Sequence, residues 1–158
     1  MEILKTFFEN CDDITISFPY TFPVLVDRLQ ATNLEGDEHI VDDRMKPTPT
    51  QKPQVIIKPH ETGEEVRIAI GELVIVMIKQ TIAECFRAYL DDLLNICRAL
   101  AMDPAGDVVK SGCEAIYQIA SSGTELLHHF TVIMARATFR ALVHQHSKVR
   151  VAGLKALN

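Results

Sequence analysis

A stretch of about twenty residues occurs twice in this chain, and this repeat constrains the fold more than any other feature. Residues 98–116 read RALAMDPAGDVVKSGCEAI, and residues 140–157 read RALVHQHSKVRVAGLKAL. Matching residues lie 42 positions apart before the turn in each copy and 41 positions apart after it. Helical sequence that repeats at about forty residues is typical of solenoids built from stacked helix pairs. Proteins of this kind usually act by holding other proteins.

Apolar residues recur every three or four positions along most of the chain, which predicts helices. The expected helices cover residues 2–10, 18–31, 64–83, 85–102, 105–121, 124–144 and 147–158. All but the first combine into helix pairs, which gives the repeats 18–83, 85–121 and 124–158. We therefore expect an all-α fold, an α-solenoid of about three HEAT-like helix pairs after a short N-terminal helix, in one domain over residues 1–158.

Two segments depart from the regular pattern. Residues 33–63 hold four of the seven prolines and six acidic residues, with little apolar periodicity. We expect them to be a long disordered insertion between the helices of the first repeat, since lengthening an exposed turn costs little free energy. The last repeat, 124–158, is short and lacks the polar outer face of a terminal repeat. It is expected to be truncated, and the domain to be part of a longer array.

Five residues at matching or turn positions are expected to hold the repeats together. Arg67 and Arg150 each open the second helix of a pair, and Asp103 lies in the turn of the middle pair. We expect each arginine to reach a carbonyl or an acid in the adjacent repeat, because a planar guanidinium suits bidentate bonds. Gly112 and Gly153 fall at matching positions where two helices pack closely. A ligand contact by the arginines is the alternative.

These features resemble the HEAT-repeat family. Its signature is an aspartate in the turn, a Val-Arg pair opening the second helix, small residues and then a leucine. The matching residues here are Val66-Arg67…Leu73, Asp103-Pro104…Val108…Ile116 and Val149-Arg150…Leu157. The middle copy departs from the signature, because Val109 stands in place of the arginine. The resemblance covers about residues 18–32 and 64–158, and it implies an architecture rather than an activity.

A narrower resemblance is carried by the last third of the chain. The segment HQHSKVRV, residues 144–151, follows FRALV and the HHF of residues 128–130, and DPAGDVVKSGCEAIYQIAS precedes them. These stretches are similar to the HEAT-repeat dynein axonemal assembly factors. The resemblance implies a cytoplasmic, non-catalytic scaffold that helps to pre-assemble axonemal dynein arms, with dynein chains, chaperones and other assembly factors as partners. A HEAT scaffold of another kind, such as a phosphatase regulatory or transport-receptor-like protein, is the alternative, and a helical-bundle enzyme is a third.

Charge and composition exclude several classes of protein. The net charge of −5 argues against general binding to nucleic acid or to a membrane surface. Charge is uneven, because residues 123–158 carry +4 and the other residues carry −9. The most apolar run, residues 68–78, is too short to span a bilayer, and the N-terminus does not read as a signal peptide. The cysteines show no CxxC pairing and indicate buried thiols of a cytoplasmic protein, namely Cys11, Cys85, Cys97 and Cys113.

The polar residues form no pattern that indicates chemistry. His128 and His129 are expected to be helical and to point about 100° apart, so one ion cannot easily bind both. His144 and His146 lie in a turn, without a cysteine or carboxylate at metal-ligand spacing. The pairs of neighbouring carboxylates are not placed to act as a general acid and base. The run 121–123 lacks the sequence context of a nucleophilic serine, and no phosphate-binding glycine motif occurs. We therefore expect no enzymatic activity, no catalytic, cofactor or metal site and no small-molecule substrate.

Overall fold

A computed structural model describes residues 2–30, 61–122 and 130–157. Its helices are α1 (Glu2–Glu9), α2 (Phe18–Leu29), α3 (Glu64–Gln80), α4 (Leu90–Ala101), α5 (Gly106–Ser122), α7 (Thr131–Leu142) and α8 (Ser147–Leu157), with two 3-10 helices, η1 (Thr15–Ser17) and η3 (Ala83–Tyr89). Within the described ranges no strand occurs. The expectation of an all-α fold is confirmed. None of the described helices is long and apolar enough to cross a membrane.

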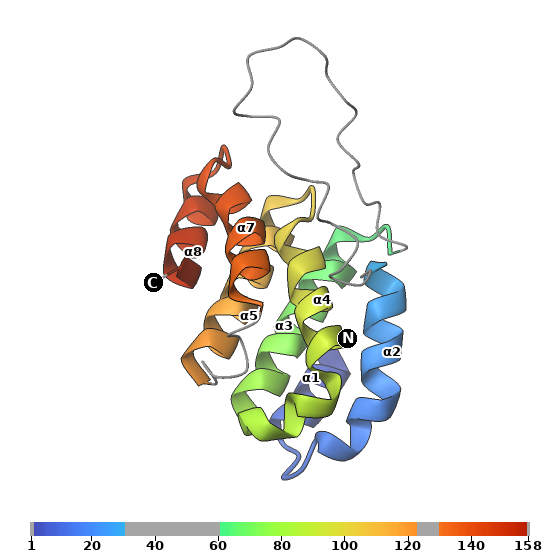
Figure 1. The fold of residues 1–158 in the computed structure, drawn as a ribbon. Coiled ribbons are helices and arrows are strands. Elements are labelled where there is room, and N and C mark those ends of the chain that lie inside the picture. Colours follow the sequence, from blue (N-terminus) through green and yellow to red (C-terminus); the bar gives the residue numbers. More distant parts are fainter. Residues whose placement is uncertain (1, 31–60, 123–129, 158) are drawn as a thin grey trace.

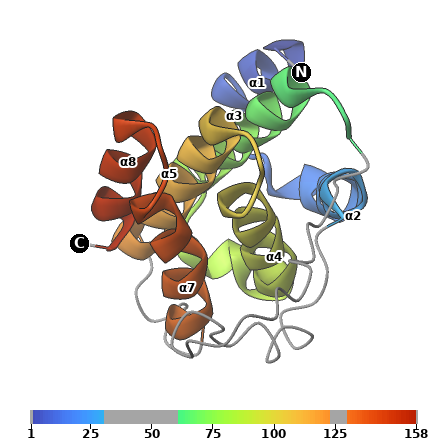
Figure 2. The same ribbon diagram turned by 90° about the horizontal axis from the view of Figure 1, so that it is seen from above.

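The helices stack in two layers, as expected of a solenoid. Helices α1, α3, α5 and α8 follow one another in the first layer, and α2, α4 and α7 form the second layer beside it (Figures 1 and 2). Each helix packs against its neighbours in the same layer, α3 against α5 and α5 against α8 most closely. Helices α4 and α5, and likewise α7 and α8, pack as antiparallel pairs across the layers. The α-solenoid architecture is confirmed.

An aromatic cluster fixes the start of the second layer. Phe18 and Phe22 of α2 stack on Phe86 and Tyr89, with ring centroids 5.1 and 5.2 Å apart respectively. Phe86 and Tyr89 belong to η3, so the expected helix from residue 85 to residue 102 is corrected: its first part is a 3-10 helix, and α4 begins only at Leu90. A 3-10 helix has three residues per turn, which puts Phe86 and Tyr89 on the same edge, where both meet α2.

Other helix boundaries also differ from those expected. Helix α2 ends at Leu29, because Gln30 adopts a left-handed conformation with φ 48° and ψ 42° and closes the helix. Of the helix expected over residues 124–144, residues 124–129 lie outside the described residues, and α7 ends at Leu142. Of the insertion expected over residues 33–63, residues 33–60 lie outside the described residues. Residues 61–63 form an ordered turn instead, in which the Glu61 N–H donates to the Arg28 carbonyl at 2.9 Å.

Candidate partner-binding surface

The turn that precedes the second helix of each pair has the same construction in all three repeats. A side chain at the start of the turn accepts a hydrogen bond from the N–H two residues further on. The three bonds join Gly63 to Glu61 Oε1 at 2.9 Å, Ala105 to Asp103 Oδ1 at 2.8 Å and His146 to His144 Nδ1 at 3.1 Å. The three acceptors lie 42 and then 41 residues apart, so an acid, an acid and a histidine occupy one repeated position.

Arg67 joins the first helix pair to the turn of the second. Its Nε donates to Asp103 Oδ2 at 2.7 Å and its Nη2 donates to Asp103 Oδ1 at 3.1 Å. The two side chains are only 7% and 3% exposed. The Asp103 carboxylate raises the pKa of the Arg67 guanidinium above its ordinary value, against the opposing effect of burial. Nη1 of Arg67 donates to the carbonyls of Glu61 and Thr62, so the same side chain also closes its own turn.

Arg150 makes half of the same set of contacts. Its Nη1 donates to the carbonyls of His144 and Gln145, both at 2.9 Å. These residues precede Arg150 by six and five positions, as Glu61 and Thr62 precede Arg67. No described residue accepts a hydrogen bond from Nε or Nη2 of Arg150. The contacts of Arg150 therefore lie in its own turn, whereas the sequence led us to expect contacts with an adjacent repeat.

The two glycines lie at the crossings of paired helices. A Cβ atom on Gly112 would lie 2.4 Å from the backbone nitrogen of Ala101 in α4. At Gly153 the nearest atom would be the Cβ of Ala141 in α7, at 2.9 Å. The first distance is the shorter of the two, so the close approach is stricter in the middle repeat than in the last.

Two ion pairs join neighbouring helices of the first layer. The sequence did not lead us to expect them. Lys5 of α1 pairs with Glu72 of α3 at 2.7 Å, and Lys155 of α8 pairs with Glu114 of α5 at 2.9 Å. Burial acts to raise the pKa of Glu114, but hydrogen bonds from Lys155 and Gln118 outweigh it, and the pKa is lowered. Glu72, Glu114 and Lys155 share one repeat position, so a charged residue at the same place in each repeat was the available signal. These four charged side chains are therefore already paired with one another.

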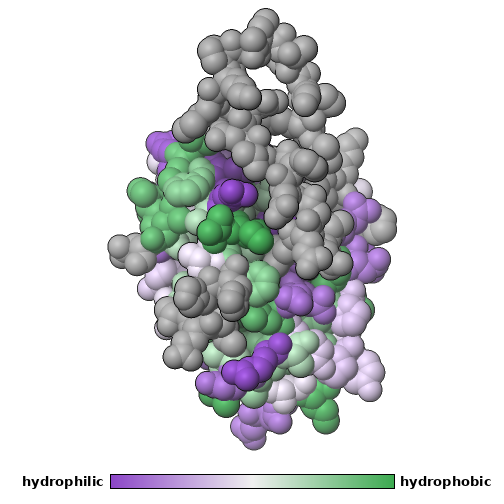
Figure 3. Space-filling view, viewed as in Figure 1, coloured by the Kyte–Doolittle hydropathy of each residue, from purple (hydrophilic) through white to green (hydrophobic). Residues whose placement is uncertain are grey.

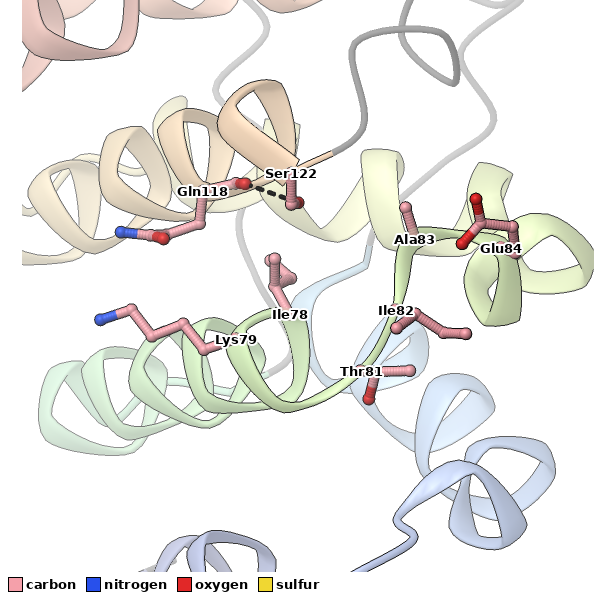
Figure 4. Close-up of a pocket in the computed structure, with 8 residues that line it drawn as sticks. All are labelled: Ile78, Lys79, Thr81, Ile82, Ala83, Glu84, Gln118 and Ser122. Carbon is pink, nitrogen blue, oxygen red and sulfur yellow. Dashed lines mark hydrogen bonds between the residues drawn. The ribbon is translucent and has the colours of Figure 1, made fainter.

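A pocket of about 420 Å³ lies where the end of α3 meets the end of α5 (Figure 4). Its lining includes Lys79 and Glu84, and the hydroxyl of Ser122, which donates to the Gln118 carbonyl at 2.8 Å. That hydroxyl has no basic partner that would make it a nucleophile. The pocket therefore contains no recognisable catalytic arrangement.

The histidines and cysteines do not form a reactive centre in the described ranges. His144 and His146 lie close, with ring centroids 5.3 Å apart, but Nδ1 of His144 accepts a backbone hydrogen bond. No group of three His, Cys, Asp or Glu side chains that could hold a metal occurs among the described residues. His128 and His129 lie outside them. Burial raises the pKa of the Cys97 thiol to about 12 and that of Cys113 to about 11, so both are protonated near neutrality.

The first-layer helices carry one repeated set of contact positions. On α3 and α5 these positions face the next helix in the layer and are buried by it, whereas on α8 two of them are exposed and one is half-buried. The sets are Arg67, Gly71 and Val74 on α3, Val109, Cys113 and Ile116 on α5, and Arg150, Leu154 and Leu157 on α8. Leu154 is 60% exposed and Leu157 is 38% exposed.

The second layer shows the same contrast. Leu94, Cys97 and Ala101 of α4 are buried, and the residues 42 positions later are exposed: Arg136 and Phe139 of α7, and Val143 directly after it. We call these positions and those on α8 the end face, defined by Arg136, Phe139, Val143, Arg150, Leu154 and Leu157. Figure 3 shows hydrophobic residues gathered on the surface over α7 and α8. Exposed apolar patches of this kind mark interaction sites.

Comparison with known proteins decides the family. The family model described as dynein axonemal assembly factor 5-like, TPR repeats, matches residues 53–158. The chain belongs to this family. Its description names TPR repeats, whose period is about 34 residues, whereas the 41- and 42-residue spacing here is that of HEAT repeats. Both types are stacked pairs of helices, and the matched region contains α3, α4, α5, α7 and α8.

Three curated members of the family resemble the chain. Dynein axonemal assembly factor 5 of Xenopus laevis is 27% identical over 136 residues, which cover 86% of this chain and 13% of that protein. The protein of the same name from Mus musculus is 30% identical over 105 residues, covering 66% and 12%. That from Homo sapiens is 27% identical over 99 residues, covering 63% and 12%. The chain thus spans about an eighth of the length of these relatives. No solved structure matches it significantly.

Proposed function

We propose that this chain is a cytoplasmic, non-catalytic scaffold that binds other proteins during the pre-assembly of axonemal dynein arms. Its partners are dynein chains, chaperones and other assembly factors. The observation that carries the proposal is the family match over residues 53–158, together with relatives that bear the name dynein axonemal assembly factor 5. The described fold suits this role, because a helical solenoid presents extended surfaces to proteins.

The chemistry of the described residues supports a role without catalysis. The buried thiols of Cys97 and Cys113 are held protonated, and a protonated thiol is a poor nucleophile. Two ion pairs join helices of the first layer, Lys5 with Glu72 and Lys155 with Glu114. Those charges are used to hold helices together rather than to transfer protons.

We also propose structural roles for the five repeat residues. Arg67 and Asp103 lock the first and second repeats together through a buried bidentate pair. Gly112 and Gly153 allow the two helices of their repeats to approach closely. Arg150 closes the last turn through Nη1 and keeps its other donors for a further contact. These roles preserve the shape of the binding surfaces rather than an active site.

Affinity purification of the tagged full chain from ciliated cells tests the proposed function. We expect dynein heavy or intermediate chains to be recovered together with chaperones, and to be lost when the cells are not assembling cilia. An unrelated helical-repeat protein of similar size, expressed at the same level, is the control. Recovery of phosphatase or transport components in place of dynein chains would overturn the proposal.

A further inference from the structure

We propose that the junction between the second and third helix pairs is a hinge, at which α7 and α8 change their angle to α4 and α5 as one body. The inference goes beyond the proposed function, because it concerns the shape of the array rather than the identity of its partners. Both junctions between pairs lie inside the chain, so the first can be compared directly with the second. Motion between rigid units lets one scaffold fit surfaces of different shape.

The first junction is fixed by a directional contact. Arg67 of α3 donates from Nε and Nη2 to the two carboxylate oxygens of Asp103, in the turn of the second pair, at 2.7 and 3.1 Å. Both side chains are almost fully buried. A bidentate bond of this kind requires one plane and one distance, so it sets the angle between the pairs as well as holding them together.

Both members of this contact are replaced at the second junction. The repeat position of Arg67 holds Val109, and that of Asp103 holds His144. Val109 is buried in an apolar cluster, and the His144 ring lies against Gly106, where an added Cβ would be 2.9 Å from its Cε1. Nδ1 of His144 accepts a hydrogen bond within its own turn. Because apolar contact is non-directional, these residues hold the pairs together without fixing their angle.

The apolar packing differs in the same sense. At the first junction Phe18 and Phe22 of α2 stack on Phe86 and Tyr89 of η3, and large rings in this arrangement interlock. No ring pair joins the second and third helix pairs among the residues that the structure describes. The cluster between α5, α7 and α8 is separate from the main core and consists of small side chains, namely Val109, Cys113, Ala141 and Val149. Packed helices with such side chains can slide by small amounts.

The ion pair that the described residues form across the second junction tolerates movement. Lys155 of α8 pairs with Glu114 of α5 at 2.9 Å, and its Nζ lies 4.2 Å from the centroid of the Tyr117 ring. The two charged side chains are 47% and 29% exposed. A lysine carries a point charge on a flexible stem, so Lys155 can follow Glu114 while α8 moves. This pair therefore holds the third repeat to the second at more than one angle.

Distances between nitroxide spin labels, measured by double electron–electron resonance on the full chain, test the hinge. Lys79 and Asp107 are exposed and span the first junction, and Ser121 and Lys148 occupy the matching exposed positions across the second. In each label pair the positions lie about 21 Å apart along the helix axes, at the usual rise per residue. We expect a broader distribution of distances for the 121/148 pair than for the 79/107 pair. Equal widths would overturn the inference.

A third label pair shows whether α7 and α8 move as one body. Val132 of α7 is exposed and lies in the same helix pair as Lys148. We expect a narrow distribution for the 132/148 pair. A distribution as broad as that across the second junction would mean that α8 itself is loose, and would overturn the hinge. All labels are attached in the variant C11S/C85S, because the other two native cysteines are buried.

Exchanging residues between the two junctions completes the test. V109R/H144D gives the second junction the ion pair of the first, and should narrow the 121/148 distribution. R67V/D103H gives the first junction the residues of the second, and should broaden the 79/107 distribution. Circular dichroism identifies the variants that fold, and if one exchange does not fold, the other decides. Widths unchanged by exchange in a folded variant would overturn the inference.

Discussion

Removing Arg67 should show how strongly the buried ion pair holds the first two repeats together. In R67M the methionine keeps most of the apolar stem but leaves Asp103, whose side chain is 3% exposed, without its cationic partner. Removal of one member of a buried pair typically costs about 3–5 kcal/mol. Domains of this size have a total stability of about 5–15 kcal/mol, so the loss would be a large part of it.

The coupling between the two residues can be measured directly. D103N keeps an oxygen that can accept the Ala105 N–H but removes the charge. We expect the double variant R67M/D103N to be more stable than the sum of the single effects predicts, by about 1–3 kcal/mol. R150M is the matched control, because Arg150 makes the equivalent carbonyl contacts without a described acid, and should cost only about 1 kcal/mol.

Urea unfolding of the full chain, followed by far-ultraviolet circular dichroism, provides the free energies. The reasoning would be refuted if R67M and R150M had equal effects, or if the effects of R67M and D103N were simply additive. Either result would mean that the pair adds no more than an exposed contact does. The inter-repeat role proposed for Arg67 would then have to be abandoned.

Three further predictions follow from the packing. G112A should destabilise the chain by about 1–3 kcal/mol because its Cβ meets backbone, and G153A should destabilise it less, because its nearest contact, the Cβ of Ala141, is longer and alanine has the higher helix propensity; thermal unfolding distinguishes them. K155A should lower the stability only slightly near neutral pH, since the pair is partly exposed. The lowered pKa of Glu114 means that this difference holds above its ordinary value of 4.5 and disappears as the pH falls through the lowered pKa; a difference unchanged in acid would contradict it. Cys97, with a pKa of about 12, should resist Ellman's reagent until the chain unfolds; because Cys11 and Cys85 are only partly buried, the test uses the variant C11S/C85S, and rapid labelling of Cys97 in its folded form would show that α4 is not packed as described.

The sequence predicted those parts of the structure that depend on periodicity. Repetition at 41 and 42 residues, with apolar residues at helical spacing, is a local signal, so the helix pairs could be placed to within a few residues. The repeat also led us to expect that Arg67 reaches a carbonyl or an acid in the adjacent repeat, although it did not name Asp103 as the partner, and the structural role of both residues stays a prediction.

Features that depend on the packed structure escaped prediction. The 3-10 form of η3 is set by the contact of Phe86 and Tyr89 with α2, which no local pattern reports. The shared capping role of Glu61 and His144 was hidden because their chemical types differ. The end face could be recognised only once Leu154 was known to occupy the position that Cys113 fills on α5.

The most direct test of the account is the number of dynein arms in cells that lack this protein. Electron tomography of axonemes from such cells should show intact doublet microtubules with few or no dynein arms, while dynein heavy chains remain in the cell body. Re-expression of the protein should restore the arms. A full set of arms in the absence of the protein would contradict the proposal that it takes part in their assembly.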